Sequence, residues 1–312
     1  MTFAVHPTVH TSPGPYRHGL FGLAFESDEA IPGLCASSTM SDAAPVRIAF
    51  GPVPRALDYI EYEDATVQAN ASEYLFTYPD VLRLCIQRDT GIVVERLDRC
   101  DPVRLWTLVL GVGASIAGFW RGFVPLHASA VVCGGKCIAL AGQSGFGKST
   151  VAASLSSLGF TVHADDLCLA QPRDGGFVVG SGVAELRLWD DAAQFLNYHA
   201  PYAKVPEIAK SVFRLPAARP VCLPLERLYA LEFADQAEAP GIYRVTGVAA
   251  LQLLVGHLRM RLGLLAVGDR RVAFETLAAI SERVEIYRFV RPQRLAELMH
   301  WSERLASHMT SS

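Results

Sequence analysis

The chain has 312 residues, 51% of them hydrophobic and 19% charged, a composition that excludes intrinsic disorder and can fill a large core. At roughly 150 residues per domain, this length predicts one large or two modest domains. Because the formal net charge is only -3, there is no polycationic surface, and we expect neither nucleic acid nor an anionic membrane as a partner.

Cysteine usage and the first residues indicate the compartment. Seven cysteines are an odd number in a chain too long to need disulfides, and no basic region followed by an apolar core opens the sequence. We therefore expect a cytoplasmic protein. The most apolar stretch, residues 105–120, is shorter than the roughly 20 residues that span a bilayer, which predicts a buried helix.

Strand patterns dominate the first hundred residues. The apolar alternation and the turn residues between the runs predict strands at 46–50, 73–77, 81–87 and 91–97. Asp101 followed by Pro102 is typical of a helix N-terminus, so the apolar helix opens a second part of the chain. We expect an α/β protein with a β-rich N-terminal domain over 1–100 and a second domain over 101–312.

The second part begins with alternating strands and helices. Gly134 and Gly135 suit the positive φ angles of a hairpin turn between strands at 127–132 and 137–141. A helix at 149–158 and a strand at 160–164 follow. Further on, the apolar patterns predict helices at 248–265, 274–284 and 292–308 and strands at 227–232 and 285–290.

Residues 142–149 match the phosphate-binding pattern G-x-x-x-x-G-K-[ST], after an apolar strand and at the start of a helix. Its glycines let backbone N–H groups surround phosphate oxygens, and the helix N-terminus adds its positive dipole. Lys148 is expected to reach the β- and γ-phosphates, and Ser149 to bind Mg²⁺. The alternative is a glycine-rich turn that binds nothing. The predicted site for ATP and Mg²⁺ comprises Gly142, Gln143, Ser144, Gly145, Phe146, Gly147, Lys148, Ser149 and Thr150.

Two carboxylates, Asp165 and Asp166, end the strand that follows the loop helix, at the sheet edge where α/β proteins bind ligands. Successive strand residues point to opposite faces, so we expect one aspartate to hold the metal and the other to take a proton. Adjacent carboxylates raise one another's proton affinity, which favours a base near neutral pH. Alternatively, one caps the following turn and the other is solvated.

Three segments together resemble the catalytic domain of bacterial HPr kinase/phosphorylase. They are the histidine-bearing residues 126–131, the G-x-S-G-x-G-K-S loop and the A-D-D sequence at 164–166, in the same order and at similarly short spacing. The resemblance implies a kinase that uses ATP and Mg²⁺. It assigns Asp166 as the general base on a substrate serine, and places Asp165 at the metal.

The same resemblance extends to residues 184–187 and to His127. Residues 184–187 are similar to the family's E-I-R segment, which implies Glu185 near the metal and Arg187 near the phosphates or substrate. An ordinary amphipathic element explains these two residues equally well. His127 resembles the family's active-site histidine, and a histidine satisfied within the core is the alternative.

The first hundred residues depart from the HPr kinase N-terminal domain, and the stretch associated with the reverse, phosphorylase activity is not evident. Residues 16–20, 47–54 and 186–189 look more like HPr-kinase-like proteins encoded with ribosomally made peptides, including the lasso-peptide tailoring kinases. This implies a serine-containing peptide or small protein as acceptor. Because HPr kinases are hexamers, the resemblance also permits a homo-oligomer.

Two other functions fit the same residues. One is a kinase whose acceptor hydroxyl belongs to a small alcohol, and the other is an NTP-dependent switch without an acceptor. The arginines from position 259 onward are interleaved with glutamates, which predicts a solvated surface of mixed charge, with binding of an acidic peptide as the alternative.

Overall fold

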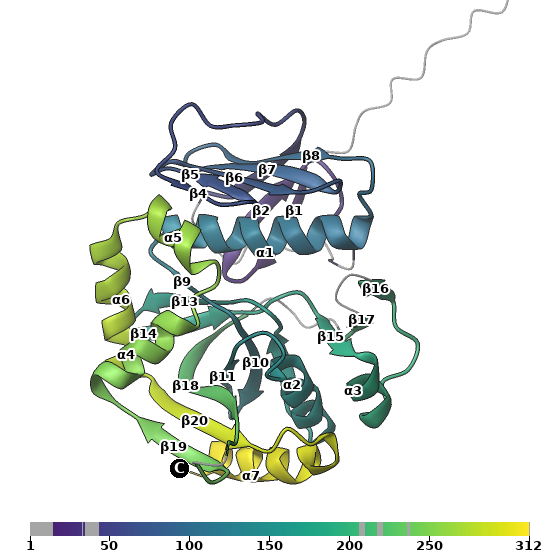
Figure 1. Cartoon of the computed structure of the whole chain (residues 1–312), viewed down its shortest axis with the longest axis vertical. Coiled ribbons are helices and arrows are strands. Elements are labelled where there is room, and N and C mark those ends of the chain that lie inside the picture. The colour runs from purple at the N-terminus through teal and green to yellow at the C-terminus, as the bar shows by residue number, and fades with distance from the viewer. Residues whose placement is uncertain are drawn as a thin grey trace, which may run out of the picture.

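The computed structural model has a mixed α/β architecture, as the sequence predicts. Figure 1 shows a curved N-terminal sheet above one long helix, α1, and a second large sheet with its helices on the other side of α1. A smaller three-stranded sheet lies beside the second one. The structure describes residues 15–32, 34, 44–205, 210–216, 221–235 and 238–311.

The N-terminal sheet has eight strands in the order β1-β2-β3-β8-β7-β6-β5-β4. The β2–β3 and β3–β8 pairs are parallel and the others antiparallel. The four predicted strands are confirmed, and the other four were not given bounds from the sequence; two of them, β4 and β5, are only two and three residues long. The bounds are β1 (Tyr16–Leu20), β2 (Leu23–Ser27), β3 (Val46–Phe50), β4 (Tyr62–Glu63), β5 (Val67–Ala69), β6 (Glu73–Tyr78), β7 (Leu82–Gln87) and β8 (Gly91–Arg96).

Helix α1 (Pro102–Trp120) joins the two large sheets. Asp101 caps it, because the Asp101 carboxylate accepts a hydrogen bond from the Arg104 backbone N–H at 2.9 Å. By length and apolarity this helix is able to cross a membrane, yet 67% of its most apolar 18-residue window is buried inside the protein. It packs against β7 and β8 and shares one hydrophobic core with both sheets. A domain boundary at residue 100 therefore stays a prediction.

The second sheet has nine strands and carries the predicted glycine hairpin. Gly134 and Gly135 adopt φ angles of 56° and 77°, between β10 and β11. The sheet is mixed, because β11, β18 and β20 run parallel to one another while the other pairs are antiparallel. Its strands are β9 (Val124–Leu126), β10 (Ala128–Cys133), β11 (Lys136–Ala141), β12 (Thr161–Ala164), β13 (Cys168–Arg173), β14 (Gly176–Gly180), β18 (Cys222–Phe233), β19 (Gly241–Val245) and β20 (Glu285–Arg291).

Helices cover both faces of this sheet. Side chains from α2 and α7 share a core with one face, and α4 and α6 contribute to the core on the other. The prediction of one continuous helix at 248–265 is wrong, because the chain forms two helices there and leaves helical geometry after His257. There Leu258 forms an antiparallel bridge with Leu126, and Met260 takes a φ of 54°. The bounds are α2 (Lys148–Ser157), α4 (Gly247–Gly256), α5 (Arg261–Val267), α6 (Arg270–Arg283), the 3-10 turn Leu295–Glu297 and α7 (Leu298–Thr310).

The segment around Glu185 forms a strand of the third sheet. It has the strand order β15-β17-β16, and β15 leads directly into a short helix, α3. Glu185 and Arg187 alternate with the buried Leu186 and Leu188, so both polar side chains lie on the same face of the strand. The bounds are β15 (Glu185–Trp189), α3 (Asp190–Phe195), β16 (Ala203–Val205) and β17 (Lys210–Arg214).

Candidate functional site

The glycine-rich loop connects β11 to α2, in the strand, loop and helix order that the pattern requires. Gly145 and Gly147 adopt φ angles of 88° and 83°, in the left-handed region that favours glycine. A Cβ atom on Gly147 would lie 2.5 Å from the Arg291 Nη2 atom, so this position also lacks room for a side chain. At these two glycines the loop therefore presents backbone atoms without a side chain.

Lys148 is buried at the first position of α2. Its ammonium group donates hydrogen bonds to the carbonyl oxygens of Gly142 at 2.8 Å and Gln143 at 3.1 Å, and lies 2.9 Å from His127 Nε2. Burial lowers the pKa of Lys148 to about 8, although Asp166 and Asp165 act in the opposite direction. The lysine head is thus held inside the loop and beside the two aspartates.

Asp165 connects the loop helix to two strands. Its Oδ1 atom accepts hydrogen bonds from the hydroxyls of Ser149 at 2.8 Å and Ser129 at 2.6 Å, and its Oδ2 atom accepts one from the Arg187 backbone N–H at 3.1 Å. The structure brings Ser149 and Asp165 together, as the sequence predicts. Hydroxyl and carboxylate oxygens are the donors that Mg²⁺ prefers, so this pair fits the ion.

Glu185, the third predicted metal ligand, lies in the same region but faces Arg187, with 3.7 Å between its Oε2 atom and Arg187 Nη2. Burial raises the pKa of Glu185, and the nearby arginines only partly offset this. Within the described residues, no three His, Cys, Asp or Glu side chains form a ready metal cluster. A role for Glu185 at the metal stays a prediction.

Asp166 turns away from Asp165, because its backbone adopts a φ of 70°, unusual for a residue other than glycine. Its carboxylate accepts a hydrogen bond from Arg259 Nη1 at 2.9 Å and lies 3.3 Å from His127 Nδ1 and 3.9 Å from Arg187 Nη1. The two aspartates therefore have different partners: hydroxyls for Asp165 and cationic or ring nitrogens for Asp166.

The charge environment of Asp166 is opposite to the one expected from paired carboxylates. Burial by itself raises the pKa of Asp166, but Arg259, His127 and Arg187 outweigh burial and bring this pKa well below its usual value. Asp166 is consequently ionised at neutral pH. The expectation of a raised proton affinity was wrong, because the sequence gives no sign of the arginines that surround this carboxylate.

His127 lies between β9 and β10, one residue before the strand in which it was expected. Its pKa is lowered mainly by burial, with Lys148 and Arg259 adding to the effect and Asp166 opposing it. The Lys148 ammonium can only donate, so Nε2 accepts, and we infer that the ring proton is on Nδ1. Nδ1 lies 3.2 Å from the Asp166 carbonyl oxygen, and the neutral ring therefore bridges Lys148 and Asp166.

Arg259 belongs to the site although the sequence predicted a solvated surface. Only 18% of its side chain is exposed, and its Nη1 atom donates to both the carbonyl and the carboxylate of Asp166 at 2.9 Å. The backbone N–H of Arg259 donates to the Pro125 carbonyl at 2.9 Å. This bond forms where the chain leaves helical geometry after α4. No local pattern marks Arg259, because its position depends on that break.

Helix α1 contacts both arginines of the site. Arg187 Nη2 donates to the Thr107 hydroxyl at 3.2 Å. One turn further along α1, a Cβ atom on Gly111 would lie 3.1 Å from Arg259 Nη2, so the glycine lets the guanidinium approach the helix closely. The helix that covers the N-terminal sheet thus also limits the positions open to the side chains around Asp166.

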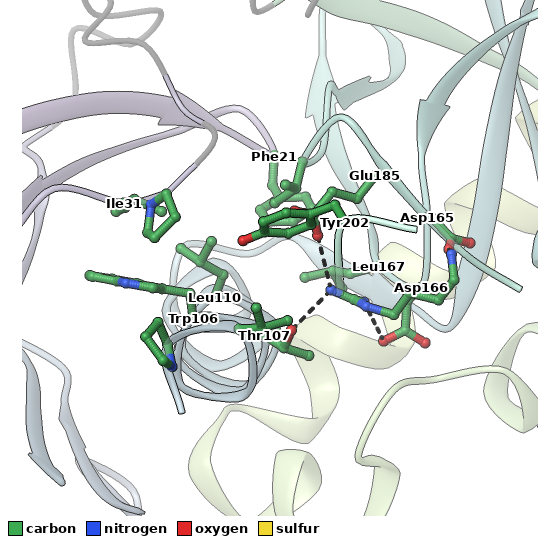
Figure 2. A pocket seen from close by; sticks show the side chains of 16 residues that line it. Phe21, Ile31, Trp106, Thr107, Leu110, Asp165, Asp166, Leu167, Glu185 and Tyr202 are labelled. Carbon is green, nitrogen blue, oxygen red and sulfur yellow. Dashed lines mark hydrogen bonds and ion pairs between the residues drawn. The ribbon is translucent and has the colours of Figure 1, made fainter. Parts of the chain in front are cut away.

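A cavity opens beside the aspartates. Figure 2 shows Trp106 and Leu110 of α1 on one side, Phe21 and Tyr202 above, and Asp166 at the end that faces the second sheet. The cavity reaches both aspartates and opens to solvent. The candidate site therefore consists of a glycine loop with a buried lysine, two aspartates with separate partners, and a mainly apolar hollow next to them.

Comparison with known proteins adds little to this geometry. The sequence matches no family profile and no curated protein. Among solved structures, the HPr(Ser) kinase/phosphatase from Coxiella burnetii is similar over 59% of this chain and 98% of its own chain, with 9% sequence identity and a TM-score of 0.27. This is a distant structural likeness that carries no argument about activity. No comparison supports the lasso-peptide kinase group in particular.

Proposed function

We propose that the protein is an ATP- and Mg²⁺-dependent phosphotransferase that acts on a hydroxyl group. The observation that supports this proposal is that the two neighbouring aspartates have different contacts. Asp165 accepts a hydrogen bond from the loop serine Ser149, whereas Asp166 lies away from that pair among Lys148, His127 and Arg259. A kinase site combines oxygen ligands for the metal with a separate carboxylate for the substrate hydroxyl.

The residues present fit the nucleotide and its ion. The loop at 142–149 and Lys148 would hold the phosphates, while Ser149 and Asp165 would hold Mg²⁺. When bound, Mg²⁺-ATP supplies the transferable γ-phosphoryl group and an ion that balances its negative charge. Lys148, Arg259 and Arg187 add positive charge in a largely buried setting, where it stabilises developing negative charge best.

In the reaction, the acceptor oxygen forms a bond to the γ-phosphorus while the bond between that phosphorus and the bridging oxygen of ADP breaks. The hydroxyl proton leaves toward Asp166. Because the cationic neighbours hold Asp166 ionised, its main contribution is to orient the hydroxyl and accept its proton as charge develops. His127, bonded through Nδ1 to the Asp166 carbonyl oxygen, helps to hold the backbone that carries this carboxylate.

For the acceptor, we propose a serine hydroxyl of a peptide or small protein, for example a lasso-type precursor peptide. This part of the proposal rests on the sequence resemblance described above. A cytoplasmic location and a homo-oligomeric state are parts of the same proposal. The alternatives, a small alcohol as acceptor or a nucleotide switch without one, use the same loop and differ in what receives the phosphoryl group.

One experiment separates these functions. We would incubate the protein with Mg²⁺-ATP and measure ADP release with and without serine peptides, and we would identify products by mass spectrometry. Phosphate on a serine peptide, absent when that serine is alanine, supports the kinase. Nucleotide hydrolysis that no alcohol or peptide stimulates supports the switch. A folded protein that neither binds nor hydrolyses ATP would overturn the proposal.

A further inference from the structure

The cavity beside Asp166, which we call the α1 pocket, has mostly apolar walls. They come from the turn between β1 and β2 (Phe21), from the segment after β2 (Ile31), from α1 (Val103, Trp106, Leu110) and from the segment before β16 (Tyr202). Phe21, Ile31, Trp106 and Leu110 are each less than 7% exposed, so the rest of the protein holds these walls in place. Figure 2 shows that the pocket leads from them to Asp166.

The polar end of the α1 pocket has unused hydrogen-bonding capacity. Arg187 donates to Thr107, but its contacts with Glu185 and Asp166 are ion pairs at 3.7 Å and 3.9 Å, too long for hydrogen bonds. Its buried Nε atom has no hydrogen-bond partner among the described residues. Because this Nε atom has no solvent access, a carbonyl oxygen arriving from the pocket would bind the terminal guanidinium nitrogens of this 16% exposed side chain, whose Nη1 atom has only the 3.9 Å contact with Asp166 among the described residues.

The size of the pocket limits its occupant. Its volume is about 50 Å³, roughly a third of the 150 Å³ cavity that holds a benzene ring in another protein. A small aliphatic group therefore fits inside it, whereas an aromatic ring would extend out of its mouth into solvent. Burying one such group gives only about a tenfold gain in affinity, which is too little to hold a free small alcohol at micromolar concentration. The rest of the acceptor must make contacts outside the pocket.

We propose that the acceptor of the α1 pocket is a peptide. The residue next to the phosphorylated serine places a small aliphatic side chain in the pocket, and a backbone carbonyl of the peptide accepts a hydrogen bond from the Arg187 guanidinium. This inference rests on the proposed kinase function and adds the specificity of its acceptor. Binding in this way brings the serine hydroxyl to Asp166 and displaces water from the same space, which favours transfer to the serine over hydrolysis.

The test uses the full-length protein and a positional library of serine peptides in which each neighbour of the serine is varied. We expect at least a tenfold higher kcat/KM with alanine or valine at one neighbouring position than with phenylalanine, glutamate or lysine there. Val103→Trp, which fills the partly exposed mouth of the pocket, should remove this preference, mainly through a higher KM. Val248→Trp, at a 71% exposed position on α4, is the matched control and should keep it.

The outcomes distinguish this inference from the proposed function. Calorimetric titration with Mg²⁺-ATP verifies that each variant keeps its nucleotide site. Phosphorylation without a small aliphatic preference, or a preference that Val103→Trp leaves unchanged, overturns the pocket assignment but not the kinase. Phosphorylation of small alcohols in place of every peptide also overturns it. No phosphorylation of any peptide or alcohol by a protein that binds ATP overturns the proposed function, and the pocket assignment with it.

Discussion

Arg259 donates a hydrogen bond to the Asp166 carboxylate at 2.9 Å, although 93 residues separate the two in the chain. The same Nη1 atom also donates to the Asp166 carbonyl. This contact fixes an aspartate whose backbone is in the left-handed region, and it is a main reason why the pKa of Asp166 is low. The state of the candidate base is therefore set by a residue far away in the sequence.

The first prediction concerns Arg259. Arg259→Ala removes the hydrogen bond and the charge that oppose burial, so the pKa of Asp166 should rise. Activity needs the ionised carboxylate, so the acidic limb of the pH profile of kcat/KM should move to higher pH. Because the variant also lacks a positive charge that stabilises the developing negative charge, kcat/KM at neutral pH should fall at least tenfold. Arg261→Ala, at an exposed position on α5, is the control. An acidic limb that stays in place would mean that Arg259 does not set the ionisation of Asp166.

The second prediction concerns the buried lysine. In the folded protein the pKa of Lys148 is about 8, below its value of 10.5 in the unfolded chain, so the folded state disfavours the charged form. Stability should rise as the pH increases from about 8 to 10.5, since the unfolded chain binds the extra proton in that range.

Lys148→Met removes both the charge and this pH dependence. We expect the variant to fold and to be at least as stable as the wild type in thermal unfolding at pH 7. Its rate of phosphoryl transfer should fall by orders of magnitude. Lys136→Met on the exposed edge of the hairpin should behave like the wild type in both assays. Near-wild-type turnover of Lys148→Met would exclude this loop as the catalytic site.

The third prediction separates the two aspartates. Asp166→Asn keeps the shape but accepts no proton, so transfer should fall about 10²-fold while ATP still binds. Asp165→Asn weakens the oxygen set shared with Ser149, so the Mg²⁺ dependence of ATP binding should change. Calorimetry with and without Mg²⁺, together with a transfer assay, measures both effects. The reverse pattern would exchange the roles of the two residues.

The fourth prediction concerns the N-terminal sheet. A protein that starts at Asp101 would expose the face of α1 that packs on β7 and β8, together with apolar side chains such as Leu105 and Val109 that are now buried. We expect this truncated chain to be insoluble or to bind the dye ANS strongly. A soluble fragment with a cooperative thermal transition would show instead that the region from Asp101 onward folds as a domain of its own.

The sequence by itself determined the features that depend on neighbouring residues. The hairpin at Gly134 and Gly135 follows from two glycines that permit positive φ angles, and the strand, loop and helix at 136–157 follow from the spacing of glycines and apolar residues. The pairing of Ser149 with Asp165 was also predictable, because the strand after a loop helix returns to the same edge of the sheet.

Only the tertiary structure decided which charges surround Asp166 and what forms the acceptor side of the site. Arg259 reaches Asp166 because hydrogen bonds to the β9 segment break a helix that the local pattern extends through it. Helix α1 looks like an ordinary core helix in the sequence, yet its Thr107 accepts a hydrogen bond from Arg187, and both residues line the cavity. The energies of these contacts depend on distances between segments far apart in the chain, and local patterns contain no information about such distances.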